Sequence, residues 1–133
     1  DITRTLAIGD ILPELERIYQ IVAQANTAGR RMARPGIPAG DIDRAARQVI
    51  EAAGYGKYFV HRTGHGIGLE GHEEPYIYAE NALILAPGMT FTVEPGIYLP
   101  GLGGARIEDN LVITETGAES ITDWSRELIV LGR

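Results

Sequence analysis

The spacing of the apolar residues changes near Gly54, and this change limits the folds that the chain can adopt. Between about Pro13 and Arg31, apolar residues recur every three or four positions, which predicts an amphipathic helix with a proline in its first turn. A second helical pattern follows a loop rich in proline and glycine, with Asp41 placed to cap the helix and Gly54 placed to end it. Beyond Gly54 the pattern predicts strands and turns.

The predicted strands flank these helices. Residues 2–8 alternate and predict a strand before both helices, with Asp1, Thr3 and Thr5 on one face. Later strand patterns are separated by the turn sequences APG, PGLGG and ETG; they are KYFVHRTGHGIG, GMTFTVEPGIYL, ARIEDNLVIT and ESITDWSRELIVL. We therefore expect one α+β domain over residues 1–133, in which two helices cover one side of a strongly curved antiparallel sheet.

Composition excludes several classes of function. The net charge of −6 and the pI near 5.0 argue against a nucleic acid partner. The sequence contains no cysteine, which excludes thiolate metal sites and cysteine nucleophiles and suits a cytoplasmic protein. Apolar runs stay below the length of about 18 residues that predicts a membrane span. Because residue 1 is Asp and leads directly into a predicted strand, we expect an excised piece of a longer protein.

All three histidines lie in the segment HRTGHGIGLEGHEEP, at positions 61, 65 and 72. Its glycines argue against a helix, and on a strand His61 and His65 would share one face, with His72 in the loop that follows. A single histidine is more often a surface residue or a hydrogen-bonded core residue than a functional group. The clustering of all three argues against that alternative.

Two acidic residues interrupt strands that are otherwise apolar. Alternation places Glu94 near the middle of the strand pattern TFTVEPG, and in ARIEDNLVI it places Arg106, Glu108 and Asn110 on one face. A buried carboxylate is costly unless it is paired or binds metal, so the alternative to a metal site is an ion pair of Glu94 or Glu108 with Arg106. Carboxylates with one imidazole suit Mn²⁺, Fe²⁺, Co²⁺ or Zn²⁺. Two bridged ions of this kind activate a shared water for hydrolysis, although the spacing does not identify the bond that is cleaved.

The segments DITRT, HRTGHGIGLEGHE, TVEPGIY and RIEDNLVIT resemble, in this order, signature segments of the M24 metallopeptidases with the pita-bread fold. The stretch EPGIYLPGLGGARIEDNLVIT is more similar to the proline peptidases, namely the Xaa-Pro dipeptidases (prolidases) and Xaa-Pro aminopeptidases, than to the methionine aminopeptidases. The resemblance spans essentially the whole chain and implies the C-terminal half of a pita-bread catalytic domain. It also implies hydrolysis of the bond preceding proline, in a peptide with proline at the second position. The implied cofactors are two divalent metal ions, with Mn²⁺ or Co²⁺ favoured over Zn²⁺ or Fe²⁺.

The resemblance also implies roles for individual residues. The positions that match metal ligands of the family are Asp1, His65, Glu94 and Glu108. Glu94 further matches the group that accepts and donates the proton, and Glu108 matches the carboxylate that bridges both ions. His61 and His72 match two non-ligand histidines that bind substrate and stabilise the developing oxyanion. Arg106 matches an arginine that orients carboxylates of the site and contacts substrate.

One feature of the family has no counterpart in these residues. The first aspartate ligand of the family precedes the segment that matches DITRT, so we expect the 133-residue chain by itself to bind metal weakly and to be inactive. The first half of the pita-bread domain is absent as well, and an uncovered sheet edge predicts a homodimer or other self-association. Two alternatives are a non-catalytic pita-bread protein-binding module, whose relatives have generally lost ligand residues, and a metal-free hydrolase such as creatinase. The clustered carboxylates argue against the second.

Overall fold

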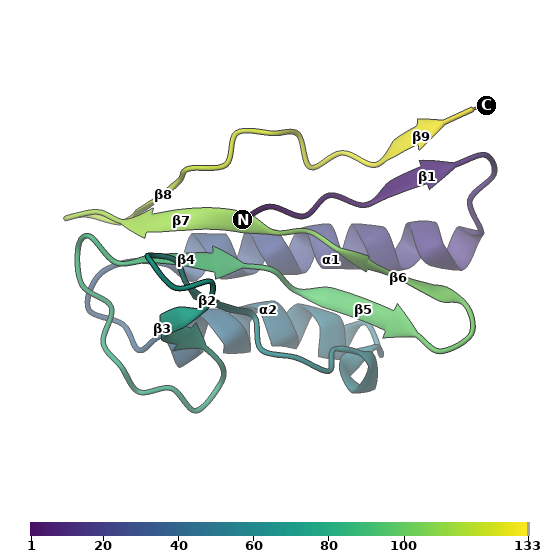
Figure 1. Cartoon of the computed structure of the whole chain (residues 1–133). Coiled ribbons are helices and arrows are strands. Elements are labelled where there is room, and N and C mark those ends of the chain that lie inside the picture. The colour runs from purple at the N-terminus through teal and green to yellow at the C-terminus, as the bar shows by residue number, and fades with distance from the viewer. Residues whose placement is uncertain (133) are drawn as a thin grey trace.

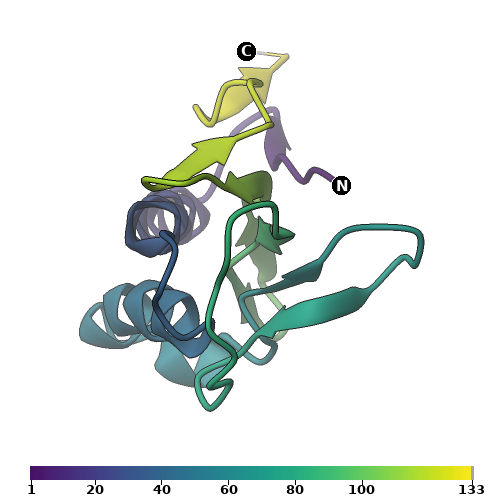
Figure 2. The same ribbon diagram turned by 90° about the vertical axis from the view of Figure 1, so that its left-hand side faces the viewer.

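A computed structural model describes residues 1–132 and places two long helices on one side of the strands (Figures 1 and 2). In chain order the elements are β1 (Leu6–Ile8), α1 (Pro13–Met32), α2 (Gly40–Ala52), the short 3-10 helix η1 (Gly56–Tyr58), β2 (Gly64–Gly66), β3 (Glu73–Ile77), β4 (Thr90–Val93), β5 (Gly96–Leu99), β6 (Gly103–Arg106), β7 (Asp109–Ile113), β8 (Ala118–Ser120) and β9 (Ile129–Leu131). No described helix is long and apolar enough to cross a membrane.

The main sheet is antiparallel, with the strand order β3-β2-β4-β7-β8. The hairpin β5-β6 extends the central pair β4-β7, because only Glu94 and Pro95 separate β4 from β5 and only Ile107 and Glu108 separate β6 from β7. Each of the two long strands expected from the sequence is therefore divided in two. These divisions lie opposite each other in the register, between the pairs Val93–Asp109 and Gly96–Arg106. The predicted curved antiparallel sheet with two helices on one side is confirmed.

The N-terminal segment departs from the prediction of a strand over residues 2–8. Regular pairing begins only at Leu6, and β1 pairs in parallel with β9 at the other end of the chain. Thr3 instead forms an isolated antiparallel bridge with Glu108. The start of the chain is therefore divided between two partners, and the bridge brings Thr3 beside one of the acids singled out in the sequence.

The core consists of two apolar clusters on the helix side of the strands. One cluster lies between both helices and the β5-β6 hairpin and includes Ile18, Val22, Ala46, Ile50, Ile97 and Ile107. The other lies between the end of α1, the start of α2 and the main sheet and includes Ile42, Ile77, Leu85, Phe91, Val93, Leu111 and Ile113. Each fully buried isoleucine contributes roughly 1.5–3 kcal/mol to folding. The clusters hold the divided hairpin against α1 and α2 on both sides of its interruption.

The first helix agrees with its prediction within one residue at the C-terminal end, but the predicted cap of the second is wrong. The N-cap position of α2 is Ala39, whose side chain makes no capping bond. Asp41 lies inside the first turn and forms an ion pair with Arg44, and its negative charge still favours the helix N-terminus. The helix ends at Ala52, and Gly54 follows with a positive φ of 87°, a conformation that glycine adopts at little cost.

Candidate functional site

The two acids of the strand patterns lie at the interruption of the long hairpin. Pro95 has no backbone N–H, so β4 cannot continue its ladder through this position. Glu94 precedes this proline, and Glu108 lies on the opposite chain between β6 and β7. Glu94 is 8% exposed and Glu108 is 3% exposed. The interruption therefore presents two largely buried carboxylates where the sheet bends.

Three possible metal ligands that are distant in the sequence lie close together in the structure. Donor atoms of Asp1, His65 and Glu108 all lie within 4.8 Å of one another. The Nε2 atom of His65 is 3.5 Å from Oδ2 of Asp1 and 3.3 Å from Oε1 of Glu94. His65 is buried, whereas the side chain of Asp1 is 47% exposed. Oxygen donors with a single imidazole fit a divalent ion of the Mn²⁺, Fe²⁺, Co²⁺ or Zn²⁺ class.

Glu94 also takes part in the ion pair considered as an alternative to metal binding. Its Oε2 atom lies 3.4 Å from Nη1 of Arg106, and its Oε1 atom accepts a hydrogen bond of 3.0 Å from the hydroxyl of Thr92. Arg106 donates from Nε to the hydroxyl of Tyr98 at 2.7 Å. The arginine therefore has a second fixed partner that sets its orientation. Glu94 therefore contacts Arg106 through Oε2 and His65 of the ligand cluster through Oε1.

Glu108 has no arginine partner among the side chains of the described residues. Its Oε2 atom accepts a hydrogen bond of 2.5 Å from the hydroxyl of Thr3. Burial raises the pKa of Glu108 and the negative charge of Glu94 adds to this effect, while the bond from Thr3 opposes it. A cation between the carboxylates would remove this cost, so the electrostatics of the cluster agree with metal binding.

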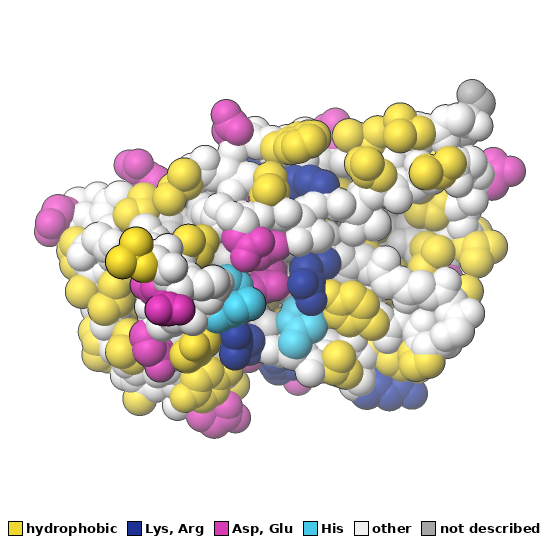
Figure 3. All heavy atoms as spheres, viewed as in Figure 1, with side chains coloured by type: hydrophobic (Ala, Val, Ile, Leu, Met, Phe, Trp, Pro, Cys, Tyr) yellow, Lys and Arg dark blue, Asp and Glu magenta, His cyan; other side chains and the backbone are white. Residues whose placement is uncertain are grey.

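The three histidines gather around one open pocket of about 420 Å³, lined by His61, Arg62, His65, His72, Glu94 and Arg106. Histidine, acidic and arginine side chains meet near the centre of the face shown in Figure 3. The rings of His65 and His72 are 4.1 Å apart at their centroids, and Nε2 of His61 is 3.5 Å from Nη2 of Arg106. Burial lowers the pKa of His61, which favours the neutral form of its ring.

The expectation that His61 and His65 share a strand is wrong, although both line the pocket. Only Gly64–Gly66 forms a strand, and His61 lies in the irregular segment before it. The glycines of β2 serve the sheet, because a Cβ atom on Gly64 would lie 1.9 Å from the carbonyl oxygen of Thr92. His72 lies in a loop, as predicted, and is exposed.

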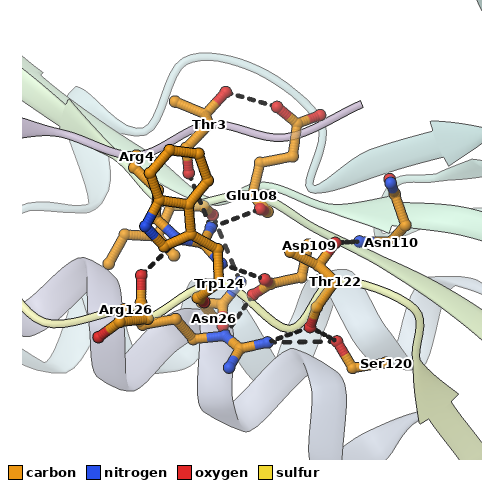
Figure 4. A network of polar contacts seen from close by, with 12 residues as sticks. Thr3, Arg4, Asn26, Glu108, Asp109, Asn110, Ser120, Thr122, Trp124 and Arg126 are labelled. Carbon is orange, nitrogen blue, oxygen red and sulfur yellow. Dashed lines mark hydrogen bonds and ion pairs between the residues drawn. The ribbon is translucent and has the colours of Figure 1, made fainter.

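A network of polar contacts around Asp109 holds the backbone next to the side chain of Glu108 (Figure 4). Asp109 is fully buried and accepts hydrogen bonds of 2.7 Å from Nη2 of Arg4 and from Nε of Arg126. Burial acts to raise the pKa of Asp109, but the bonds from Arg126 and Arg4 outweigh it and hold the pKa below its ordinary value. Arg4 also donates to the backbone carbonyl of Glu108 at 2.7 Å. The network thus joins the chain start, the C-terminal segment and the backbone of a candidate ligand.

Helix α1 contributes a second support that the sequence analysis missed. Asn26 is fully buried and donates from Nδ2 to the carbonyl oxygen of Val93 at 3.0 Å, immediately before Glu94. Its hydrogen bond to Ile107, immediately before Glu108, is longer at 3.4 Å. A polar residue on the apolar face of α1, between Val22 and Gly29, was the available signal.

Comparisons with known proteins agree with the sequence motifs. Residues 1–115 match the sequence model of metallopeptidase family M24. Over 131 residues the chain is 52% identical to the probable dipeptidase PepE of Mycobacterium tuberculosis, covering 98% of this chain and 35% of that protein. It is 47% identical over 129 residues to the Xaa-Pro dipeptidase of Pyrococcus furiosus, covering 97% and 37%.

A solved dipeptidase structure from Pyrococcus horikoshii OT3 superposes with a TM-score of 0.96 at 53% identity, covering 98% of this chain and 36% of that one. The chain thus spans little more than a third of the length of these relatives.

Proposed function

The chain belongs to metallopeptidase family M24, and from this membership and the site geometry we propose that it is the C-terminal catalytic part of an Xaa-Pro dipeptidase or aminopeptidase. The substrate is a peptide with proline at its second position, and the bond preceding that proline is hydrolysed. The observation that carries the proposal is the convergence of Asp1, His65 and Glu108 within 4.8 Å, with Glu94 3.3 Å from His65. Relatives named dipeptidase or Xaa-Pro dipeptidase support it.

Two divalent ions would be held by Asp1, His65, Glu94 and Glu108, together with an aspartate from outside these residues. When bound, the ions supply the Lewis acidity that makes a water nucleophilic near neutral pH. Mn²⁺ or Co²⁺ is favoured, and Zn²⁺ and Fe²⁺ tolerate the same donors. Glu94 is placed to accept the proton of the attacking water and to pass it to the prolyl nitrogen that leaves. Its bond from Thr92 keeps Oε1 directed at this side of the site.

Three residues around the pocket bind and orient the substrate. The exposed ring of His72 donates an N–H group to the carbonyl oxygen as negative charge develops on it. The Nδ1–H of His61 donates to the carbonyl oxygen of Arg62 at 2.7 Å, so Nε2 of its neutral ring is left as an acceptor for an N–H of the substrate. Arg106 keeps Glu94 in place through its 3.4 Å contact and leaves part of its guanidinium group available to the peptide. The open pocket of about 420 Å³ between these groups has room for the side chains of a dipeptide.

The 133 residues by themselves bind metal weakly and lack turnover, because one carboxylate ligand lies outside them. The complete protein works in the cytoplasm as a homodimer, and the 133-residue chain associates with itself. Elemental analysis after dialysis against Mn²⁺ compares the chain with the full-length protein that contains it. We expect about two ions only in the full-length protein. Full occupancy and normal turnover by the 133-residue chain would contradict this part of the proposal.

The activity is tested in the full-length protein with an Xaa-Pro dipeptide and with the same peptide carrying alanine in place of proline. Glu94→Gln keeps the size of the side chain but removes its basicity, so we expect kcat to fall by about 100-fold or more. Glu119→Gln makes the same change at an exposed position of β8 and should leave kcat unchanged. Retained turnover in Glu94→Gln refutes the role of Glu94. A wild-type protein that binds no metal and cleaves neither peptide would favour the non-catalytic protein-binding module.

A further inference from the structure

Helix α2 carries a buried ion pair that lies outside the cluster of candidate ligands. Nε of Arg47 is 3.0 Å from Oδ2 of Asp43, one helical turn earlier, and Nη2 is 3.2 Å from Oδ1. The carboxylate is fully buried, and the arginine side chain is 26% exposed. Such a pair is a weak source of stability, because its desolvation cost offsets the attraction between the charges. The other contacts of both residues therefore indicate what the pair does.

Those contacts all go to one irregular segment, residues 59–63. Arg47 donates to the carbonyl oxygens of Phe59 and His61, each at 3.0 Å. Oδ1 of Asp43 accepts from the backbone N–H of Thr63 at 3.0 Å and from its hydroxyl at 2.7 Å. Arg47 also stacks over the ring of Phe59 at 4.2 Å, and that ring meets His61 edge-on at 5.0 Å. The pair thus holds the backbone on both sides of His61.

The same segment continues to the ligand strands. The carbonyl oxygen of Thr63 accepts the backbone N–H of Glu94 at 2.7 Å. The ring of His61 is 3.5 Å from Arg106, which in turn is 3.4 Å from the carboxylate of Glu94. Two paths therefore lead from the pair on α2, one through backbone to Glu94 and one through the imidazole to Arg106. Both paths end at the group that is placed to move the proton.

We propose that the Asp43–Arg47 pair is a positioning element that fixes the imidazole of His61 relative to Arg106 and, through Arg106, relative to the carboxylate of Glu94. The proposal rests on the proposed function for its catalytic consequence, but its geometric content stands on the contacts alone. Residues 59–63 have no strand partner that would define their path, apart from single backbone bonds such as that of Thr63 to Ile77. The planar guanidinium is required because one side chain must reach two carbonyl oxygens and a carboxylate at once.

The variant Arg47→Lys in the full-length protein tests whether the planar shape of the arginine, rather than its positive charge, positions His61. Lysine keeps the positive charge beside Asp43 but cannot bridge both carbonyl oxygens in the planar arrangement of arginine. We expect kcat to fall about 10- to 100-fold with a smaller change in KM, because a displacement of about 1 Å at a reacting group costs this much. Metal content and the unfolding temperature should stay close to wild type. Arg44→Lys, at an exposed pair on the same helix, is the matched control and should change none of these values.

A spectroscopic readout keeps the test independent of turnover. In protein labelled with ¹⁵N-histidine, the ring resonances of His61, assigned by their loss in His61→Gln, should shift in Arg47→Lys and remain in place in Arg44→Lys. Unchanged His61 resonances with unchanged kcat would overturn the proposal. A proportional loss of metal, unfolding temperature and kcat would overturn it as well, because the pair would then be structural. If the wild-type protein cleaves no Xaa-Pro peptide, the proposed function fails, and the resonance shift still decides the positioning role.

Discussion

Replacing Asp109 by asparagine tests whether a buried carboxylate joins the two ends of this chain. Asp109 binds Arg4, which lies just before β1, and Arg126, which lies just before β9. The strands β1 and β9 pair with each other in parallel as a separate two-stranded sheet (Figure 1). Asparagine has nearly the same shape but places an N–H₂ donor against a guanidinium donor. The substitution therefore leaves Arg4 and Arg126, and also Arg30 of α1 at 3.6 Å, without their shared counter-charge.

The size of the effect follows from the burial of the groups. Removing one partner of a buried ion pair costs about 3–5 kcal/mol. The side chain of Arg4 is 8% exposed and that of Arg126 is 27% exposed, and both keep bonds to backbone carbonyl oxygens. We therefore take the lower end, about 3 kcal/mol, which corresponds to a change of roughly 100-fold in the opening equilibrium of β1 and β9.

Hydrogen exchange followed by mass spectrometry of the full-length protein measures this opening directly, because amide exchange follows local unfolding. In Asp109→Asn, peptides covering residues 1–9 and 120–131 should exchange roughly 100-fold faster, while peptides from α2 change little. Asp123→Asn makes the same chemical change at an exposed position of the same segment and is the control. Exchange in Asp109→Asn equal to that of the control would refute the reasoning, because the carbonyl partners of the arginines would then suffice.

Three further predictions concern the site in the full-length protein. Gly64→Ala would place a Cβ atom 1.9 Å from the carbonyl oxygen of Thr92, so we expect a destabilisation of about 1–3 kcal/mol or more and a parallel loss of metal; wild-type unfolding temperature and metal content would contradict this. Thr3→Val removes the 2.5 Å bond to Glu108 and should weaken metal affinity about 10-fold or more in competition with a chelator, and Thr3→Ser should restore it. Because burial lowers the pKa of His61, an NMR titration of the metal-free protein should give a midpoint below 6.5. Below pH 6.5 the unfolded chain then binds more protons at His61 than the folded chain, so the free energy of unfolding decreases as the pH falls below 6.5. A midpoint at or above 6.5 would refute the lowered pKa of His61.

Local patterns in the sequence predicted the elements and the unusual acids. A helix or strand buries one face, so the spacing of apolar residues identified α1, α2 and the central strands β4 and β7 of the sheet, but not the edge strand β3. The same patterns marked Glu94 as an acid within an apolar strand, and its burial agrees with that interpretation. The ordered motifs identified the family, and residues 1–115 match it. The burial of Asp43 could also have been predicted, because this acid shares a helix face with Ala46 and Ile50, but the sequence analysis missed it.

The tertiary structure alone decided how these residues meet. Thr3 and Glu108 are 105 positions apart and share a hydrogen bond, and no local spacing relates Asp43 on α2 to Thr63 beside β2. The expected continuous strands are divided at Glu94–Pro95 and opposite it, because Pro95 has no backbone N–H with which β4 could continue its ladder. The spacing of side chains describes one segment at a time, whereas the distance between two segments depends on how all the apolar faces pack together. For this reason the sequence indicated which residue types carry the chemistry, and the packing of the helices against the bent hairpin placed them around one pocket.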